Sequence, residues 1–257
     1  MFVLNLSDQV VLVTGASRGL GASIAKAFGQ AGAKVVVNYY KSDKEAKEIA
    51  ANIGMDRAIA IKADIRDAYD VEKMLIIAKT HFGQGVTTIV NNALVNFKFD
   101  AANRKDVDHV QWEDYQEQFE GSVKGALNTI KFAKKDMVSK NFGRIINIGT
   151  NLVQNPVVAY HEYNTGKAAL LGFTRNMAKD LGEHGITVNM VSAGLLQQTD
   201  ASAATPPEIF ELIKESTPLK AVTTPEDVAD VVLFFASPWS RAITGQNLVV
   251  DGGLVMD

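Results

Sequence analysis

The sequence predicts an α/β fold, with one doubly wound parallel sheet of about seven strands and helices on both of its faces. Short apolar runs rich in Val and Ile alternate along the chain with longer segments of helical spacing. Runs that are apolar on both faces are typical of buried parallel strands, which right-handed crossovers connect. The chain has no Pro/Ser-rich linker and no change in composition that would mark a domain boundary, so we expect residues 1–257 to form a single domain.

The expected strands are the apolar runs that end at glycine, polar or turn residues. They are Gln9–Thr14, Lys34–Asn38, Ala58–Lys62, Thr88–Asn91, Arg144–Ile148, Thr187–Val191 and Asn247–Val250.

Apolar residues at helical spacing predict the helices between these strands. Ile24, Phe28 and Ala31 share one face, and Gly32 is expected to end that helix. A later segment ends near Gly182, and its apolar residues recur at Leu170, Phe173, Met177 and Leu181.

Two segments break the alternation. Phe97–Gln111 is polar and charged, and we interpret it as a surface loop before a helix that starts near Trp112. Thr199–Thr224 contains three prolines and a short helical piece around Glu208–Glu215. It follows the C-terminal end of a strand, where open α/β sheets bind ligands, so residues 199–224 are expected to form a substrate lid.

Composition excludes several classes of protein. With 47% hydrophobic and 21% charged residues, the chain is typical of a globular protein. A net charge of −3 argues against nucleic acid as a partner. The chain has no cysteine and only four scattered histidines, so no metal site is expected. There is no long apolar run and no signal-peptide pattern, which predicts a cytoplasmic protein without a membrane partner.

A glycine-rich loop follows the first expected strand and precedes a helix, with the sequence Thr14-Gly15-Ala16-Ser17-Arg18-Gly19-Leu20-Gly21. A pyrophosphate needs backbone N–H groups, which a helix N-terminus supplies together with a favourable dipole. Gly15 permits the tight turn, Gly19 lets the backbone approach phosphate, and Gly21 allows close packing of helix and strand. The loop is therefore a candidate dinucleotide site.

The end of the second expected strand favours NADP(H) over NAD(H). It reads Asn38-Tyr39-Tyr40-Lys41-Ser42, with no acid before Asp43 that would repel a 2′-phosphate. Arg18 and Lys41 supply positive charge, and Ser17 and Ser42 supply hydroxyls, although both cations are also consistent with solvated surface charges. Asp64 follows the third strand and fits either an adenine contact or a helix-cap or turn role.

Tyr163 and Lys167 stand four residues apart at the start of a helical segment, on one helix face. An ammonium beside a phenol stabilises the phenolate and lowers the pKa of the tyrosine. A phenol tuned in this way is a good proton donor to an alkoxide that forms during hydride transfer.

In combination, these motifs resemble the short-chain dehydrogenase/reductase family over nearly the whole chain. They are the loop at 14–21, Asn91-Asn92-Ala93, a hydroxyl residue at Thr150, Tyr163 with Lys167, and Asp251-Gly252-Gly253, in one order. The resemblance implies a Rossmann-like fold, with Tyr163 as acid/base and Lys167 binding the cofactor ribose. It also implies cofactor contacts from Leu20, Asn38, Tyr39, Ile65, Asn91, Ala93, Gly194, Leu196 and Thr199.

Several residues depart from the family pattern. The substrate-orienting serine is Thr150, and the asparagine of a proton relay is Ser122, which is shorter. The remaining departures are Leu94 after Asn-Asn-Ala, Ala193 before Gly194, and Thr199 one place late with Gln198 at the expected position. A second tyrosine, Tyr160, has the spacing to Lys167 that is typical of enoyl-thioester reductases, but the glycine loop has the ketoreductase form.

The resemblance implies an NADPH-dependent carbonyl reductase, and most closely a reductase of 3-oxoacyl thioesters. Lys134, Lys135 and Lys140 could meet an acidic acyl carrier protein, or form a solvated helix face. The alternatives are a steroid, sugar or polyol substrate, an enoyl thioester reduced through Tyr160, and a non-catalytic NADP(H) sensor. Family members are commonly tetramers, so a homotetramer is expected, with a dimer as the alternative.

Overall fold

The computed structural model describes residues 6–197 and 199–256, which leaves Gln198 outside the described residues. Within this part of the chain, seven strands form one parallel sheet in the order β3-β2-β1-β4-β5-β6-β7. The strands are β1 (Val10–Val13), β2 (Lys34–Tyr39), β3 (Ala58–Lys62), β4 (Thr88–Asn91), β5 (Gly143–Thr150), β6 (Ile186–Ala193) and β7 (Asn247–Val250).

All seven predicted strands are confirmed, and three of them agree to the residue. Strands β5 and β6 are longer than predicted. β5 and β6 pair in register over eight residues, from Gly143 opposite Ile186 to Thr150 opposite Ala193. This extension places Thr150 inside the sheet rather than in a loop after it.

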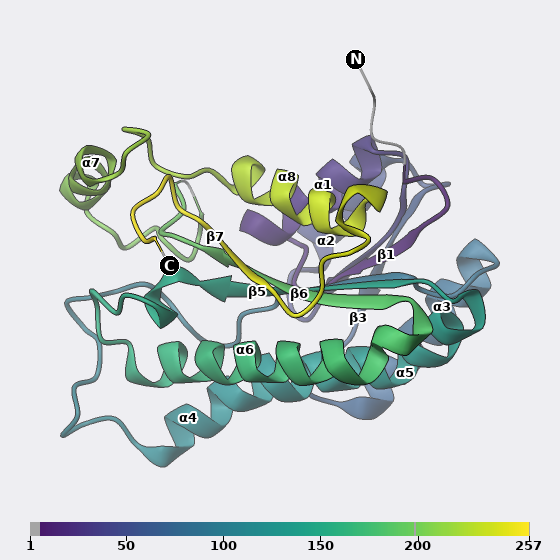
Figure 1. Ribbon diagram of the computed structural model, residues 1–257, viewed down its shortest axis with the longest axis horizontal. Helices are drawn as coiled ribbons and strands as arrows, with labels where there is room; N and C mark the ends of the chain where they lie inside the picture. Colours follow the sequence, from purple (N-terminus) through teal and green to yellow (C-terminus); the bar gives the residue numbers. More distant parts are fainter. Residues whose placement is uncertain (1–5, 198, 257) are drawn as a thin grey trace.

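The helices occupy both faces of the sheet, as Figure 1 shows, with α1, α2 and α8 on one side and α3, α4, α5 and α6 on the other. Their bounds are α1 (Gly19–Gln30), α2 (Asp43–Ile53), α3 (Ala68–Phe82), α4 (Trp112–Phe119), α5 (Gly125–Lys140), α6 (His161–Leu181), α7 (Pro207–Ser216) and α8 (Pro225–Ala236). The doubly wound fold class is therefore confirmed.

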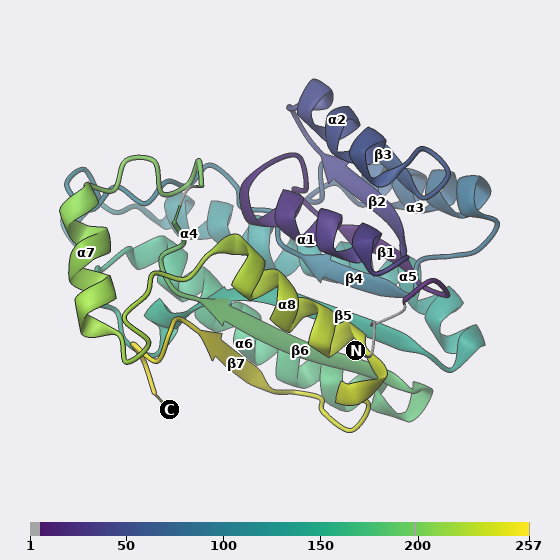
Figure 2. The same cartoon turned by 90° about the horizontal axis from the view of Figure 1, so that it is seen from above.

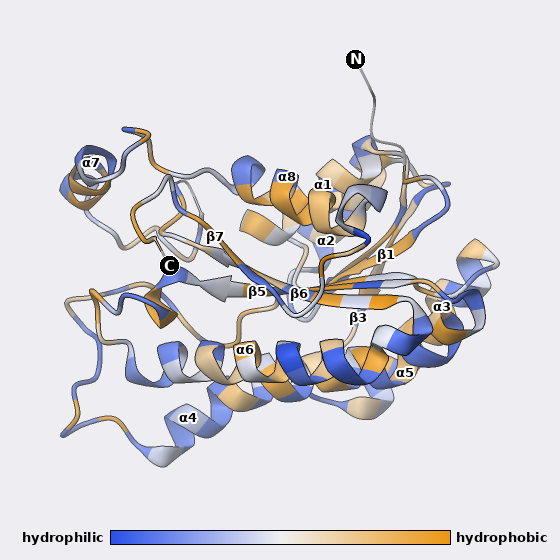
Figure 3. Cartoon of the chain, viewed as in Figure 1, coloured by the Kyte–Doolittle hydropathy of each residue, from blue (hydrophilic) through white to orange (hydrophobic). Residues whose placement is uncertain are grey.

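The core consists of two apolar layers, one on each face of the sheet. Ile24 and Phe28 of α1 are fully buried on one face, and Met74, Met137 and Leu181 are buried on the other. Figure 3 shows the strands as largely apolar and the outer helix faces as polar. This distribution accounts for the uninterrupted Val and Ile runs of the sequence, because both faces of each central strand are covered.

Glycines end two of the helices by different routes. Gly32 has φ +87° and lets the Ala33 N–H reach the Phe28 carbonyl at 3.0 Å, which ends α1 as predicted. Gly182 keeps a right-handed conformation and begins a short 3-10 turn after α6. The left-handed residue that ends this turn is Gly185, at φ +69°.

α4 starts at Trp112 as predicted and continues into α5 through a π-helical turn, Glu120–Lys124. Residue 122 lies in this turn. A π turn inserts an extra residue into the helical spacing, and such turns are frequent at functional sites.

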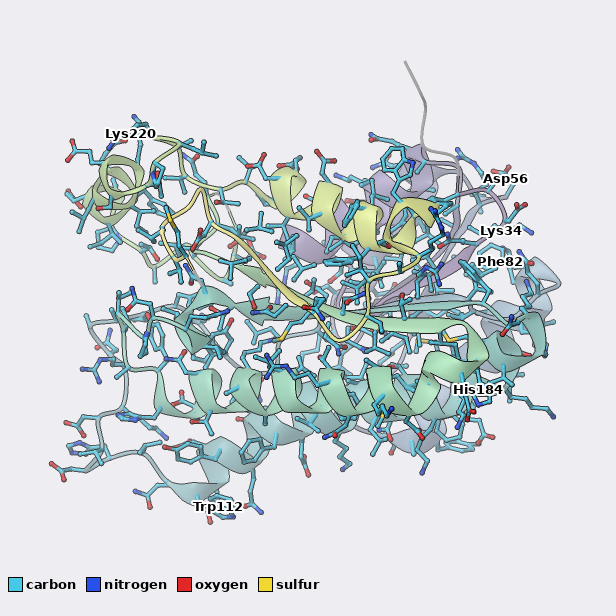
Figure 4. The ribbon with its side chains drawn as sticks, viewed as in Figure 1. Lys34, Asp56, Phe82, Trp112, His184 and Lys220 are labelled. Carbon is cyan, nitrogen blue, oxygen red and sulfur yellow. The ribbon has the colours of Figure 1, made fainter. Side chains whose placement is uncertain are left out.

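The two ends of the sheet differ in what they carry. At the N-terminal end, the Lys34 ammonium donates to the Phe82 carbonyl at 3.3 Å, and Figure 4 labels both residues on the side of the molecule opposite Lys220. At the other end, toward which the strand arrows point, α7 stands away from the sheet (Figure 2). The strand order reverses between β1 and β4, and in sheets of this kind ligands bind at that point beyond the C-terminal ends of the strands.

Candidate active site

The glycine-rich loop between β1 and α1 has the backbone shape that the sequence predicts. Gly15 and Gly19 both have positive φ, +62° and +52°, where a side chain would be strained. A Cβ at Gly21 would lie 2.4 Å from the Gly15 carbonyl oxygen and 2.5 Å from Asn92 Nδ2. The glycines therefore keep a Cβ away from three positions around the start of α1, which fits the pyrophosphate of a dinucleotide.

The Asn-Asn-Ala turn after β4 holds this loop in place. The Asn92 and Ala93 N–H groups donate to Thr14 Oγ1 at 2.9 and 3.0 Å. Asn92 Nδ2 donates to the Thr14 carbonyl at 2.9 Å. The turn thus supports the loop next to the crevice between β1 and β4.

Asn91 belongs to a buried chain of polar side chains beneath the site. Asn91 Nδ2 donates to Asn147 Oδ1, Thr129 Oγ1 donates to Asn91 Oδ1, and Asn147 Nδ2 donates to Thr174 Oγ1, each at 2.8 Å. This chain joins β4 and β5 to α5 and α6. Because Asn91 is fully engaged with protein, its expected contribution to the cofactor site is indirect.

Asn38 also supports the loop rather than lining an open ribose site. Its side chain is buried, with Oδ1 accepting from the Gly15 N–H at 3.2 Å and Nδ2 donating to the Ala63 carbonyl at 3.1 Å. The Ala16 N–H adds a bond to the Asn38 carbonyl at 2.8 Å.

A hollow of about 460 Å³ lies at the ends of β2 and β3, lined by Tyr39, Tyr40, Lys41, Asp43 and Lys62. The Asp43 carboxylate accepts from the Tyr39 hydroxyl and from Lys47 at 2.7 Å. The hydrogen bond to Asp43, together with burial, raises the pKa of Tyr39 to about 12.

Lys62 is a candidate residue that the sequence reasoning missed. It ends β3, and the pairing of β2 with β3 places it opposite Tyr39. The sequence did offer a signal for Lys62, because this lysine ends an expected strand beside the candidate ribose site.

Ser42 stands directly before α2 and does not cap this helix through its side chain.

The loop cation Arg18 is engaged by the beginning of the 199–224 segment. Its guanidinium lies 3.3 Å from the Asp200 carboxylate, and both side chains are exposed. Thr199 is the nearest neighbour of a Cβ built on Gly19, at 3.7 Å. The 199–224 segment therefore begins next to the phosphate loop. The other two predicted loop residues, Ser17 and Leu20, flank Arg18 and Gly19 in the sequence.

Asp64 has the turn role that the sequence left open. Its carboxylate accepts from the Arg66 side chain at 2.7 Å and from the Arg66 N–H at 3.0 Å, and Arg66 holds the pKa of Asp64 below its ordinary range. The neighbouring Ile65 is buried, and its carbonyl accepts from Asn128 at 2.9 Å.

Thr150, Tyr163 and Lys167 converge at the C-terminal end of β5. Tyr163 and Lys167 lie on the buried face of α6, and the Tyr163 hydroxyl is hydrogen-bonded to Thr150. The Lys167 ammonium donates to the Ile148 carbonyl at 2.8 Å and lies 5.8 Å from the centre of the Tyr163 ring. The helix spacing predicted from the sequence thus brings these groups together.

Burial dominates the electrostatics of this group. It raises the pKa of Tyr163 well above the ordinary value of 10, and the hydrogen bond to Thr150 offsets only part of the rise. Burial also lowers the pKa of Lys167 from 10.5 to about 8. The pKa of Tyr163 is therefore raised and not lowered as the sequence suggested, because both groups are removed from water.

Phe97 and Phe99 cover the Tyr163 ring, although the sequence assigns their segment to a surface loop. Phe97 stacks on Tyr163 with 4.3 Å between ring centres and 12° between planes. Tyr160, the alternative acid, is buried edge-on against Phe97, and burial raises the pKa of Tyr160. The sequence carried no signal for these contacts beyond two phenylalanines in a polar segment.

The remaining predicted positions lie close to this group. Ser122 is buried in the π turn, and among residues 6–197 and 199–256 no hydrogen bond joins Ser122 to Lys167. Asn151, directly after Thr150, donates to Asp251 at 2.9 Å, and a Cβ at Gly194 would lie 2.8 Å from Asp251 Cβ. Leu196 is buried below Ser202, which donates to its carbonyl at 2.8 Å.

The described residues contain no group of three or more His, Asp or Glu side chains arranged to hold a metal ion. No helix among them has the length and apolar character required to cross a bilayer.

Known proteins resemble the chain along almost its full length. A family model described as enoyl-(acyl carrier protein) reductase matches residues 15–255. A 3-oxoacyl-[acyl-carrier-protein] reductase of Synechocystis sp. is 36% identical, with 98% of each chain covered. The hydroxynaphthalene reductase-like protein Arp2 of Metarhizium acridum is 33% identical, with 98% of this chain and 96% of the relative covered. The crystal structure of a dehydrogenase/reductase from Sinorhizobium meliloti 1021 superposes with a TM-score of 0.87 at 31% identity, covering 99% of this chain and 98% of the other.

Proposed function

The chain belongs to the short-chain dehydrogenase/reductase family and is an oxidoreductase, and from this premise we propose that it reduces a ketone with NADPH. The observation that carries the proposal is the convergence of Thr150, Tyr163 and Lys167 beside the β1/β4 crevice. A bound nicotinamide supplies the hydride, and the side chains supply the proton and the orientation.

Tyr163 is the proposed acid. Its hydroxyl is the donor nearest to an alkoxide that would form at Thr150, and a positioned general acid typically contributes a factor of about 100 to 10,000 to the rate. Thr150 is proposed to hydrogen-bond the substrate oxygen. The Lys167 ammonium has three donors, one of which the Ile148 carbonyl uses, so it can also hold a ribose hydroxyl and favour the phenolate.

The proposed cofactor is NADP(H). Lys41 and Lys62 line the hollow at the ends of β2 and β3, and its carboxylate, Asp43, is already engaged by Tyr39 and Lys47. A 2′-phosphate there would meet positive charge. Titration of the protein's fluorescence with NADPH and NADH tests this. We expect tighter NADPH binding that weakens severalfold in Lys62→Ala, and equal binding of both cofactors would contradict the proposal.

The proposed substrate is a 3-oxoacyl thioester, as the name of the Synechocystis relative suggests. An acyl carrier protein could present it, with Lys134 and Lys135 as candidate contacts. Lys140 is less suited to that role, because its ammonium already donates to Gln84 at 2.8 Å.

The decisive experiment follows absorbance at 340 nm with NADPH and an acetoacetyl thioester. Tyr163→Phe is expected to abolish turnover while NADPH binding persists. Tyr160→Phe is the matched control, because it removes the hydroxyl of a second buried tyrosine, which packs against Phe97, and it should keep most of the activity. The reverse result would assign the proton to Tyr160 and favour an enoyl substrate.

We further propose that residues 199–224 act as a lid over a single domain and that the cytoplasmic protein is a homotetramer. α7, within the lid, has no buried residue, which supports such a movement. Light scattering of the purified protein distinguishes a tetramer from a dimer.

A further inference from the structure

Phe97 and Phe99 contact the ring of the proposed acid, and Tyr160 packs against both of them. Phe97 lies flat on the Tyr163 ring, 4.3 Å between centres. Phe99 and Tyr160 meet the Phe97 ring edge-on, at 5.1 and 5.2 Å, with angles of 84° and 87°. Phe97 therefore occupies a slot with one aromatic face and two aromatic edges.

The backbone on both sides of Phe97 is anchored. Gln118 of α4 donates to the Val95 carbonyl at 3.0 Å, and Asn96, at φ +43°, donates to Glu117 of the same helix. On the other side, the Phe99 N–H donates to the Ala201 carbonyl at 3.1 Å. The two rings are thus positioned by α4 and by the start of the lid, while the Phe97 side chain itself stays partly exposed.

The Phe97 ring is the part of this slot that a substrate can contact. Tyr163 is almost fully buried, and its ring face is covered by Phe97. The Phe97 side chain is partly exposed, so a group carried next to the carbonyl of a ketone bound at Tyr163 would lie against the Phe97 ring.

We propose that Phe97 is a specificity-determining residue and that the enzyme prefers ketones bearing a planar aromatic ring near the carbonyl. The inference rests on the proposed ketone reduction and narrows its substrate class. Saturated and aromatic rings of equal size gain similar stabilisation from burial. Only the aromatic ring also gains stacked and edge-to-face contacts, which favour it by about two- to tenfold for each ring pair.

The test compares two thioesters of N-acetylcysteamine that differ only in ring saturation. The 4-phenyl-3-oxobutanoyl and 4-cyclohexyl-3-oxobutanoyl groups carry the same unconjugated ketone. With saturating NADPH, we expect kcat/KM to favour the phenyl compound by at least about fivefold. Phe97→Leu, which keeps an apolar side chain and removes the aromatic face, should reduce that preference to less than about twofold.

Val107→Ala is the matched control, since Val107 lies in the same segment and is 74% exposed. It should keep the wild-type preference. Equal rates for both thioesters in the wild-type enzyme, or an unchanged preference in Phe97→Leu, would overturn the inference and leave the proposed ketone reduction intact.

A binding measurement keeps the two proposals separable. In the presence of NADP⁺, calorimetry should show tighter binding of 2-naphthol than of trans-2-decalol, and Phe97→Leu should remove the difference. Loss of turnover on every ketone would refute the proposed function. Tighter binding of 2-naphthol would still support the slot, and equal binding of 2-naphthol and trans-2-decalol would refute the slot.

Discussion

Replacing Lys167 with methionine should stabilise the cofactor-free protein at neutral pH. Lys167 is 4% exposed, and burial lowers its pKa from 10.5 to about 8. Since one pKa unit corresponds to about 1.4 kcal/mol, burying the charged lysine costs about 3 kcal/mol at pH 7. Methionine removes this cost but leaves the Ile148 carbonyl without its donor, a loss of about 1 kcal/mol. The expected net gain is about 2 kcal/mol.

The gain should depend on pH in a direction fixed by linkage. Below pH 8 the lysine is protonated in both the folded and the unfolded chain, so the folded protein bears the full cost. Between pH 8 and 10.5 the folded lysine loses its proton while the unfolded lysine keeps it, so wild-type stability rises relative to the variant. At pH 9.5 the advantage of Lys167→Met should have fallen by about 2 kcal/mol.

Urea denaturation followed by circular dichroism measures this difference. The free energy of unfolding of both proteins is determined at pH 7.0, 8.0 and 9.5, at one protein concentration and without cofactor. Both proteins retain Tyr163, so its titration is common to the comparison. A stability difference that stays constant across this range would refute the description of Lys167 as a buried, destabilised ammonium.

Further predictions concern the phosphate loop. Asp200→Asn removes the carboxylate that holds Arg18, so NADPH affinity should rise by about two- to fivefold, the value of an exposed ion pair, while NADH affinity stays unchanged. Fluorescence titration checks this, and an equal effect on both cofactors would contradict it. Gly21→Ala places a Cβ 2.4 Å from the Gly15 carbonyl oxygen and should lower the free energy of unfolding by about 1–3 kcal/mol. Gly172→Ala in α6 is the matched control, because nothing lies within 4 Å of its Cβ, and it should raise stability by up to about 1 kcal/mol; a loss there would show that the clash argument is incomplete.

The fold could be predicted from the sequence because burial on both faces of the sheet leaves a direct trace. Ala58–Lys62, Thr88–Asn91 and Asn247–Val250 are apolar runs with polar boundaries, and each matches its strand. Gly143 and Ala193 extend their strands beyond the predicted runs, because pairing between β5 and β6 rather than side-chain character decides where these strands end.

The candidate site was predictable where it depends on local spacing. Tyr163 and Lys167 meet because residues four apart share a helix face. Contacts between distant segments left no such trace. Phe97 on Tyr163, Asp200 on Arg18 and Lys62 opposite Tyr39 arise from the tertiary arrangement, as does the burial that reverses the expected pKa of Tyr163.

The π turn between α4 and α5 makes the length of this helix a structural constraint. Gln118 on one side of the turn holds the Val95 carbonyl, and on the other side Thr129 holds Asn91. The turn takes up one extra residue, so the two halves keep the orientation in which both contacts form. One further residue wound as regular α-helix would rotate one half relative to the other by about 100°. Only one of the two contacts could then survive, so insertions should be excluded from this stretch even where amino-acid exchanges are tolerated.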